Sequence, residues 1–160
     1  MDARVVTSGP NLEEIRILFR EYAQWVALDL SFQRFAEELA GLPGDYAAPH
    51  GTLLLCVEGG VSAGCIGVHM WQARTCEMKR LYVRPGFQGL GCGRLLAQRA
   101  ISWAVQAGYE RMLLDTLPAM AAAQGLYERL GFRDIEPYRP NPVRGARFMA
   151  LELHGNRSPQ

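Results

Sequence analysis

The sequence predicts a single α+β domain, built on a mixed, mostly antiparallel sheet with helices on both faces. Three observations lead to this fold class. The chain has 160 residues, a length that suits one domain with one substantial core. Strand-like and helix-like segments follow one another in the order β-α-α-β-β-β-α-β-α-β-β. A Gly-Gly pair and a longer Gly-rich segment lie where the chain must turn between two of them.

The first third of the chain is expected to contain one short strand and two helices. A strand is predicted at residues 4–7, closed by Ser8-Gly9-Pro10. Asn11 is expected to cap a helix, because Glu14 stands where a capping box requires an acidic residue. The apolar residues of this helix recur at helical spacing, at Leu12, Ile15, Phe19, Tyr22 and Val26. A second helix is predicted to begin after Ser31, with Phe32, Phe35 and Leu39 as its apolar residues.

The centre of the chain is expected to form three strands and a long helix. Residues 52–57 are rich in strand formers, Gly59-Gly60 is typical of a hairpin, and the returning strand is predicted at 63–71. A third strand follows at 76–83. A Gly-rich turn then opens a helix that ends at Gly108, and its buried stripe is expected to be Leu96, Ala100, Trp103 and Ala107.

The last third is expected to complete the sheet. A strand is predicted at 112–115 and an Ala-rich helix at 119–130, followed by closing strands at 132–135 and 146–153. Between the closing strands, three prolines within 137–142 prevent regular ladder bonding, so we expect a stiff loop there.

Charge and hydropathy exclude several classes of protein. The formal net charge is +1, and the Lys and Arg residues are scattered, which argues against nucleic acid and anionic membranes as partners. No apolar stretch approaches the length of a membrane span, and the N-terminus leads into no signal-like segment. We therefore expect a cytoplasmic protein.

The cysteines and histidines do not form a recognisable metal motif. The four cysteines (Cys56, Cys65, Cys76 and Cys92) include no CxxC pair, and three of them lie in apolar, strand-like runs. The histidines (His50, His69 and His154) have no ligand spacing. The sequence therefore predicts no metal site, and the cysteine usage agrees with a reducing compartment.

The most informative segment is Val83-Arg-Pro-Gly-Phe-Gln-Gly-Leu-Gly-Cys-Gly-Arg94, which runs from a strand through a tight loop into a helix. Free backbone N–H groups at a helix start attract phosphate, and glycines let the backbone approach it. The glycines could instead serve only the turn. Three alternating glycines lose much chain entropy on folding, however, which a turn alone does not explain.

Two common nucleotide loops fail on spacing. A Walker loop requires Gly-Lys-Ser/Thr, which is absent, and a dinucleotide fingerprint starting at Gly89 would require glycine where Arg94 stands. Gln88-x-x-Gly91-x-Gly93 matches instead the Q/R-x-x-G-x-G/A pyrophosphate loop of the Gcn5-related N-acetyltransferase (GNAT) superfamily.

The resemblance to this family extends over residues 61–132. Cys76-Glu-Met-Lys-Arg-Leu-Tyr-Val83 resembles its fourth strand, and Leu126-Tyr-Glu-Arg-Leu-Gly-Phe132 resembles its Leu-Tyr-Glu-x-x-Gly-Phe signature. By this resemblance, residues 1–160 form one N-acetyltransferase domain. Its expected parts are acceptor-side helices in 1–50, an acetyl-CoA-binding core in 51–153 and a tail in 154–160.

The resemblance also implies where acetyl-CoA binds. Coenzyme A is expected in a cleft where the fourth and fifth strands splay apart, with its pantetheine arm on the backbone of Leu81, Tyr82 and Val83. The loop residues expected at the pyrophosphate are Gln88, Gly89, Leu90, Gly91, Cys92, Gly93 and Arg94. Met120 stands where the family often has Asn, and because Met cannot donate a hydrogen bond, no polar contact is expected from it.

Glu77 is the candidate general base. A primary amine of pKa about 10 must lose a proton before it attacks, which costs roughly 4 kcal/mol at pH 7. A carboxylate can take that proton directly or through water, and histone-modifying members of the superfamily place a glutamate at this spacing. Strand alternation is expected to put Glu77 on the same side as Leu81 and Val83. The alternative is an outward charge paired with Lys79.

Tyr127 is the candidate partner of the leaving thiolate. Its hydroxyl could protonate the thiolate or donate a hydrogen bond to it, while a backbone N–H near Leu81 would stabilise the oxyanion. The alternative is a tyrosine that only packs against Leu126 and Phe132.

The acceptor is expected to be a primary amine of a small molecule, an amino acid or a peptide. Three sets of side chains could recognise it. Trp25, Phe32, Phe35 and Tyr46 could line an apolar pocket. Glu13, Glu14, Glu21, Glu37 and Glu38 could attract a cation, and Arg139, Arg144 and Arg147 could hold a carboxylate.

Two other functions stay open at this point. One is a non-catalytic coenzyme A sensor, and the other is a phosphate-binding module unrelated to coenzyme A. Whether the chain forms a homodimer is also left open by the sequence.

Overall fold

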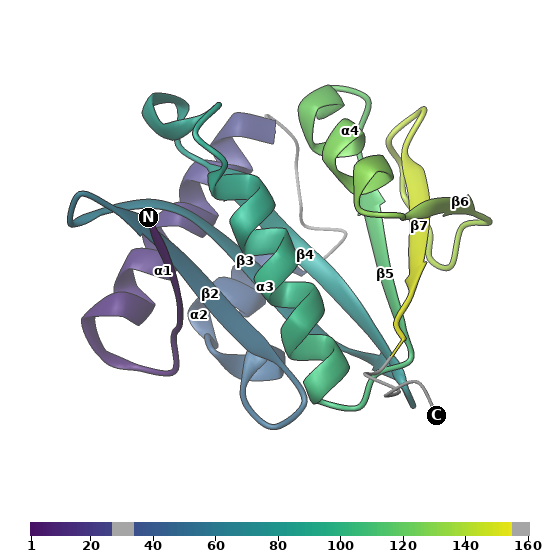
Figure 1. Cartoon of the computed structure of the whole chain (residues 1–160), viewed down its shortest axis with the longest axis horizontal. Helices are drawn as coiled ribbons and strands as arrows, with labels where there is room; N and C mark the ends of the chain where they lie inside the picture. The colour runs from purple at the N-terminus through teal and green to yellow at the C-terminus, as the bar shows by residue number, and fades with distance from the viewer. Residues whose placement is uncertain (27–33, 155–160) are drawn as a thin grey trace, which may run out of the picture.

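The computed structural model describes residues 1–26 and 34–154, which form one seven-stranded sheet in the order β1-β2-β3-β4-β5-β7-β6 (Figure 1). Every neighbouring pair is antiparallel except β4 and β5, which run parallel. The strands are β1 (Asp2–Val5), β2 (Thr52–Glu58), β3 (Val61–Gln72), β4 (Thr75–Val83), β5 (Arg111–Thr116), β6 (Arg133–Ile135) and β7 (Arg147–Glu152). The predicted mixed, mostly antiparallel sheet is confirmed.

Helices cover both faces of this sheet, as predicted. They are α1 (Gly9–Val26), α2 (Phe35–Ala40), α3 (Cys92–Gln106) and α4 (Ala121–Arg129), with short 3₁₀ turns η2 (Gly44–Tyr46) and η3 (Pro85–Phe87). In Figure 1, α3 crosses the front of the sheet and α1 and α2 lie behind it. The core therefore has two parts, one containing the buried residues of α3 and α4 and one containing those of α1.

The N-terminal boundaries differ from the expectation. The first strand ends at Val5, and α1 begins at Gly9, so Asn11 lies inside the helix and does not cap it. The physical reason is Pro10, whose fixed φ suits the first turn of a helix and whose missing N–H costs nothing there. The expected start of the second helix after Ser31 and its Phe32 lie outside the described residues, and α2 is described from Phe35.

The central segments follow the prediction closely. Gly59 and Gly60 have φ of 58° and 77°, which closes the hairpin between β2 and β3 with two residues. In α3, Leu96 and Ala100 are buried as expected, but Ala107 follows the helix and is exposed, and Trp103 is only half-buried. Ala97 and Ala104 complete the buried stripe instead, because their small side chains let α3 approach the sheet closely.

The predicted splay between the fourth and fifth strands is confirmed. Pairing of β4 with β5 ends at Glu77 and Leu113, and beyond that point the two strands diverge (Figure 1). The edge of β4 from Leu81 to Val83 therefore forms no ladder with β5. Since an unpaired strand edge presents free backbone donors and acceptors, this edge is available to a ligand.

A β-bulge at Arg80 corrects the expected side-chain alternation. Lys79 pairs with Gly67, but Tyr82 pairs with Cys65, so one extra residue lies in β4. Arg80 has a positive φ of 63°, and the side chains reverse their facing beyond it. Leu81 and Val83 pack on the core beneath α3, as Cys76 and Met78 do before the bulge. Glu77, which alternates with Cys76 and Met78, therefore faces the opposite side from Leu81 and Val83, and the expectation of a common side is wrong.

The described residues bear on three further expectations. All four cysteines are buried and free. No three or more His, Cys, Asp or Glu side chains within residues 1–26 and 34–154 gather as a metal site would require. In the same part of the chain, no helix combines the length and the apolar character needed to cross a membrane.

Candidate active site

A groove of about 440 Å³ lies where the loop before α3 meets α4 and the free edge of β4. It is lined by Trp25, Leu81, Val83, Phe87, Gln88, Gly89, Gly91, Cys92, Gly93, Arg94, Ala122, Ala123, Leu126 and Arg129. Of the residues expected to bind the cofactor, only Tyr82 and Leu90 are not part of this lining. The groove therefore joins the Gly-rich loop to the splayed strand in one continuous surface.

The Gly-rich loop presents backbone amides to the groove. Gly89 and Gly91 have φ of 80° and 89°, and Gly91 is the N-cap residue of α3, so glycine supplies the turn that other residues adopt only with strain. Among the described residues, no hydrogen bond is formed by the amide nitrogens of residues 89–94. Free amides at a helix start favour an anion.

Gly93 requires a different explanation, because its φ is ordinary. A Cβ at this position would come no closer than 3.7 Å to Val83 and 3.8 Å to Leu126, which is normal contact. Neither the backbone nor the packing therefore demands glycine here. Its absent side chain keeps the groove open beside the amides, which agrees with a ligand at this point.

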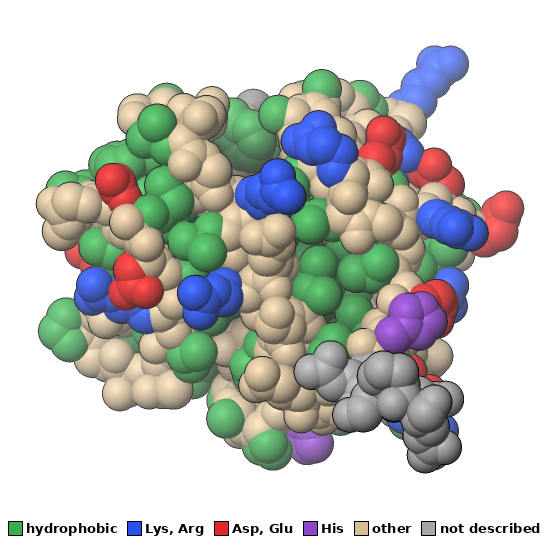
Figure 2. Space-filling model, viewed as in Figure 1, with side chains coloured by type: hydrophobic (Ala, Val, Ile, Leu, Met, Phe, Trp, Pro, Cys, Tyr) green, Lys and Arg blue, Asp and Glu red, His purple; other side chains and the backbone are tan. Residues whose placement is uncertain are grey.

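Two basic side chains, Arg94 and Arg129, line the same groove. Figure 2 shows basic side chains on this face, between the N-terminal part of α3 and α4, beside a band of apolar surface. Acidic and basic groups are otherwise interspersed over this face. The positive charge is thus local to the groove, where a phosphorylated ligand would need it.

The two expected cofactor residues outside the lining differ in their surroundings. Tyr82 is buried toward α1, and its hydroxyl donates to Glu21 at 3.3 Å. Glu21 also binds Arg84 at 2.7 Å, so α1 is attached to the end of β4. Leu90 is 58% exposed at the tip of the loop. Any contact of Tyr82 with a ligand in the groove must therefore use its backbone, as the sequence expectation assumed.

A small cavity of about 30 Å³ lies at the splay and contains the candidate Tyr127. Its lining also includes Tyr22, Met78, Lys79, Arg80, Leu81, Asp115 and Met120. Tyr127 is 6% exposed, and burial, with the nearby charge of Asp115, raises the pKa of its hydroxyl. The hydroxyl therefore stays neutral at physiological pH and can donate a hydrogen bond.

Glu77 is fully buried within a network of donors. Its carboxylate accepts hydrogen bonds from Tyr138 at 2.5 Å and Arg139 at 2.5 Å, contacts His69 Nε2 at 2.8 Å, and lies 4.0 Å from Lys79 Nζ. Burial alone would raise the pKa of Glu77, but these neighbours together lower it to about 2. The expected pairing with Lys79 is thus one of several contacts, and Glu77 carries its charge at any working pH.

The loop after β6 fixes this network in place. Arg139 stacks over Trp71, with its guanidinium carbon 4.6 Å from the ring centroid, and Tyr138 meets the same ring edge-on. Asn141 donates to Asp115 at 3.2 Å. Of the arginines considered for a carboxylate ligand, Arg147 pairs with Asp134 and Glu128, so it is engaged outside this network.

The sequence did not predict that four residues would lie around Glu77 and Tyr127, namely His69, Asp115, Tyr138 and Arg139. His69 could have been found, because it stands opposite Glu77 in the antiparallel register of β3 and β4. Asp115 carried a weaker signal as an acidic residue near the end of a strand. Nothing in the sequence indicates that the loop carrying Tyr138 and Arg139 lies over Glu77.

Comparison with known proteins identifies the family. Residues 12–132 match the Acetyltransferase (GNAT) family. The chain belongs to this family. An uncharacterized N-acetyltransferase from Schizosaccharomyces pombe is 41% identical over 145 residues, which cover 89% of each chain. The GNAT protein is therefore an N-acetyltransferase, as the resemblance in its sequence implied.

Solved GNAT structures share the fold described above. A GNAT acetyltransferase from Staphylococcus aureus Mu50 has a TM-score of 0.76 at 21% identity, covering 96% of this chain and all of its own. YncA from Salmonella typhimurium, solved with its cofactor acetyl-CoA, has a TM-score of 0.68 at 24% identity and covers 99% of this chain and 98% of its own.

The stability of this GNAT domain is expected to depend on pH through Glu77. Its pKa is lowered on folding from 4.5 to about 2, so its ionised form stabilises the native state above pH 4.5. This contribution, about 3 kcal/mol from the pKa difference, is lost as the pH falls from 5 toward 2. Urea unfolding of wild type and Glu77→Gln between pH 7 and pH 3 measures it. The difference between the two proteins should shrink on acidification, and a constant difference would contradict the prediction.

Proposed function

We propose that this protein transfers the acetyl group of acetyl-CoA directly to a primary amine of a small molecule, an amino acid or a peptide. The observation that supports this most is a continuous lining: the groove with free amides at the start of α3 reaches the unpaired edge of β4 at Leu81, which also lines the cavity of Tyr127. This lining would join a phosphate site to a place where a thioester can react.

Acetyl-CoA suits the groove in both shape and charge. In this proposal the pyrophosphate binds the amides of residues 89–94, with Arg94 and Arg129 offsetting phosphate charge. The pantetheine arm extends along the backbone of residues 81–83 as an added strand. Residues 51–153 then form the cofactor-binding core, and the helices within residues 1–50 belong to the acceptor side. Acetyl-CoA in the similarly folded YncA supports this arrangement.

The reaction requires one bond to form and one to break. The neutral amine nitrogen bonds to the carbonyl carbon and loses a proton, and the carbon–sulfur bond breaks to release coenzyme A as a thiolate, which then takes up a proton. In this proposal Tyr127 donates a hydrogen bond to the departing sulfur, and a backbone N–H near Leu81 stabilises the oxyanion. Their preorganisation in a buried site strengthens both interactions.

Glu77 is the proposed proton acceptor, and its network sets a condition on that role. A carboxylate of pKa about 2 is a weak base. It becomes a stronger base only if an incoming amine or a water displaces Arg139 or Tyr138, because those donors stabilise its ionised form. Asp115 is a second candidate, since it lines the cavity of Tyr127 and Glu77 does not.

Tyr127→Phe is expected to lower turnover by about ten- to a hundredfold, because it removes one hydrogen bond to a developing thiolate, worth about 1.5–3 kcal/mol. The ring remains packed against Phe132, so the melting temperature should hardly change. Acetyl-CoA affinity should change much less, because the charge on sulfur develops only in the transition state. Steady-state kinetics and calorimetry measure the two effects. Equal losses in affinity and turnover would make Tyr127 a packing residue of the cofactor site.

The proposed function is tested by calorimetry with acetyl-CoA, followed by a thiol-release assay with a panel of amines. The acetyltransferase should bind acetyl-CoA and release thiol only when an amine is present. A coenzyme A sensor would bind acetyl-CoA without amine-dependent thiol release. A phosphate-binding module would bind inorganic pyrophosphate as well as it binds acetyl-CoA.

A further inference from the structure

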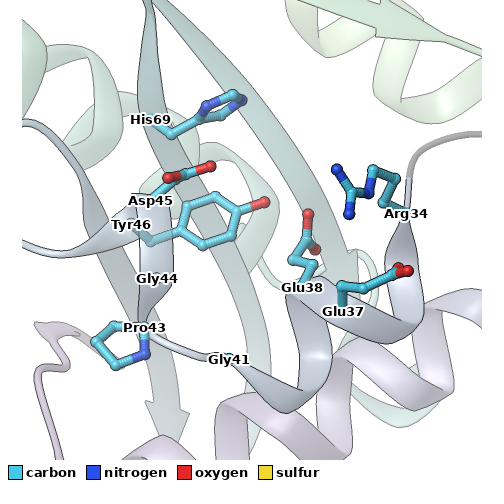
Figure 3. A pocket seen from close by; sticks show the side chains of 9 residues that line it. All are labelled: Arg34, Glu37, Glu38, Gly41, Pro43, Gly44, Asp45, Tyr46 and His69. Carbon is cyan, nitrogen blue, oxygen red and sulfur yellow. The ribbon is translucent and has the colours of Figure 1, made fainter.

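A second pocket, of about 320 Å³, lies between α2, the η2 turn and β3 (Figure 3). Its charged and polar lining is Arg34, Glu37, Glu38, Asp45, Tyr46 and His69. It shares no lining residue with the cofactor groove. Three of the four groups with a fixed charge on its wall are acidic, so it favours a cation over an anion.

The hydroxyl of Tyr46 has no hydrogen-bond partner among the described residues, although the side chain is only 4% exposed. The ring is held firmly, edge-on to Phe19 at 6.0 Å and to His69 at 5.7 Å. It also lies so close to β3 that a Cβ at Gly67 would come within 2.6 Å of it. In Figure 3 the hydroxyl points along the pocket toward Glu38. An unpaired buried hydroxyl is costly, so its fixed position favours a ligand that completes its hydrogen bonding.

The acidic groups are available to a cation to different degrees. Glu38 pairs with Arg80 at 2.9 Å, whereas Glu37 and Asp45 form no ion pair among the described residues. Arg34 is exposed and likewise has no ion pair within residues 1–26 and 34–154, so a ligand can displace its side chain at little cost. The described carboxylates do not converge as metal ligands would. An organic ammonium group suits this arrangement better, because it can donate to Tyr46 and a carboxylate together.

The pocket adjoins the proposed reaction site through two side chains. His69 lines the pocket and contacts Glu77 at 2.8 Å. Arg80 binds Glu38 of the pocket and lines the cavity that contains Tyr127. A ligand that fills the pocket is therefore separated from Glu77 by the side chain of His69 alone. It is separated from the splay by the side chain of Arg80 alone.

We propose that this pocket binds a positively charged group of the acceptor, remote from the amine that is acetylated. This inference rests on the proposed function and narrows the acceptor to diamines and to molecules that carry a comparable second ammonium group. Burial raises the pKa of Tyr46, and the interaction of its hydroxyl with Glu38 and the charge of Glu77 add to this effect, although Arg80 opposes it. The hydroxyl therefore stays neutral and accepts a hydrogen bond from the ammonium group.

The test compares 1,4-diaminobutane with n-butylamine, which has the same carbon chain and one charge fewer. The diamine is expected to have a kcat/KM about tenfold or more higher, the effect of one hydrogen bond to a charged group. Tyr46→Phe and the double variant Glu37→Gln/Asp45→Asn should each bring the ratio toward one. Glu110→Gln, which removes an exposed carboxylate outside the pocket, should keep the wild-type ratio.

Direct binding makes the outcome independent of turnover. Calorimetric titration of 1,4-diaminobutane into the coenzyme A complex should give binding that Tyr46→Phe weakens about tenfold. Equal kcat/KM for the two amines, with thiol release observed, would contradict the proposed role of the pocket and leave the proposed function in place. Absence of thiol release with every amine would overturn the proposed function, and the titration would then decide the pocket alone. If Tyr46→Phe binds 1,4-diaminobutane with wild-type affinity and keeps its melting temperature, the proposed role of the pocket would also be contradicted.

Discussion

Gly91→Asp is expected to weaken acetyl-CoA binding by about a hundredfold or more, the loss of two charge-assisted hydrogen bonds. Gly91 is the N-cap residue of α3, next to amides that have no partner among the described residues. An Asp carboxylate at this position would accept those hydrogen bonds itself and repel an incoming phosphate. Calorimetry with acetyl-CoA measures the loss directly.

The fold of this variant should survive, because a Cβ at Gly91 would meet no atom within 4 Å. The remaining cost is the positive φ of 89°, about 1–2 kcal/mol for a side chain in this region. Gly91→Asn is the matched control, since Asn has the same size, tolerates this φ and carries no charge. The Asn variant should retain much more affinity than the Asp variant. Near-wild-type affinity in Gly91→Asp would rule out a phosphate at this loop.

Glu77→Gln is expected to reduce turnover by about a hundredfold or more, because the amide keeps the shape of the side chain but cannot accept the proton. Acetyl-CoA affinity should hold, since Glu77 is not part of the groove. Raising the pH should restore part of the activity, because more of the amine is then already neutral. A pH–rate profile of both proteins tests all three expectations.

The variant Arg139→Gln tests whether Glu77 accepts the proton or only holds the loop in place. Arg139 donates to Glu77 and stacks on Trp71, so its loss loosens the loop and frees the carboxylate. If Glu77 only anchors the loop, the two variants should lose similar activity and neither should recover at high pH. Unchanged turnover in Glu77→Gln would mean that another group accepts the proton. Asp115→Asn is then the next variant to measure.

The sequence was most informative where structure follows from neighbouring residues. The hairpin at Gly59-Gly60 and the loop before α3 were predictable, because glycine is needed where φ is positive. The cap at Asn11 was wrong, because Pro10 fits the first helical turn equally well and starts α1 earlier. The splay between the fourth and fifth strands was predicted from the family resemblance, whereas the order of the strands in the sheet was not predicted.

Contacts between distant segments could not be predicted in the same way. Arg80 adopts a positive φ that is rare for a long side chain, stabilised by its ion pair with Glu38 and by the rings of Tyr22 and Phe35. All three partners of Arg80 come from other elements, so no local sequence pattern predicts the bulge. The prolines after β6 likewise predict a stiff loop. They do not predict that this loop places Arg139 against Glu77.

Transfer of a labelled acetyl group tests the central claim most directly. Acetyl-CoA labelled with ¹³C in its acetyl group is incubated with the protein and a primary amine, and mass spectrometry follows the amine while a thiol reagent follows coenzyme A. We expect the N-acetylated amine to carry the label and to appear in equal amount with free thiol, and Gly91→Asp to suppress both. Thiol release with the label recovered only as acetate, or no release above the protein-free rate for any amine, would contradict an N-acetyltransferase that uses this groove.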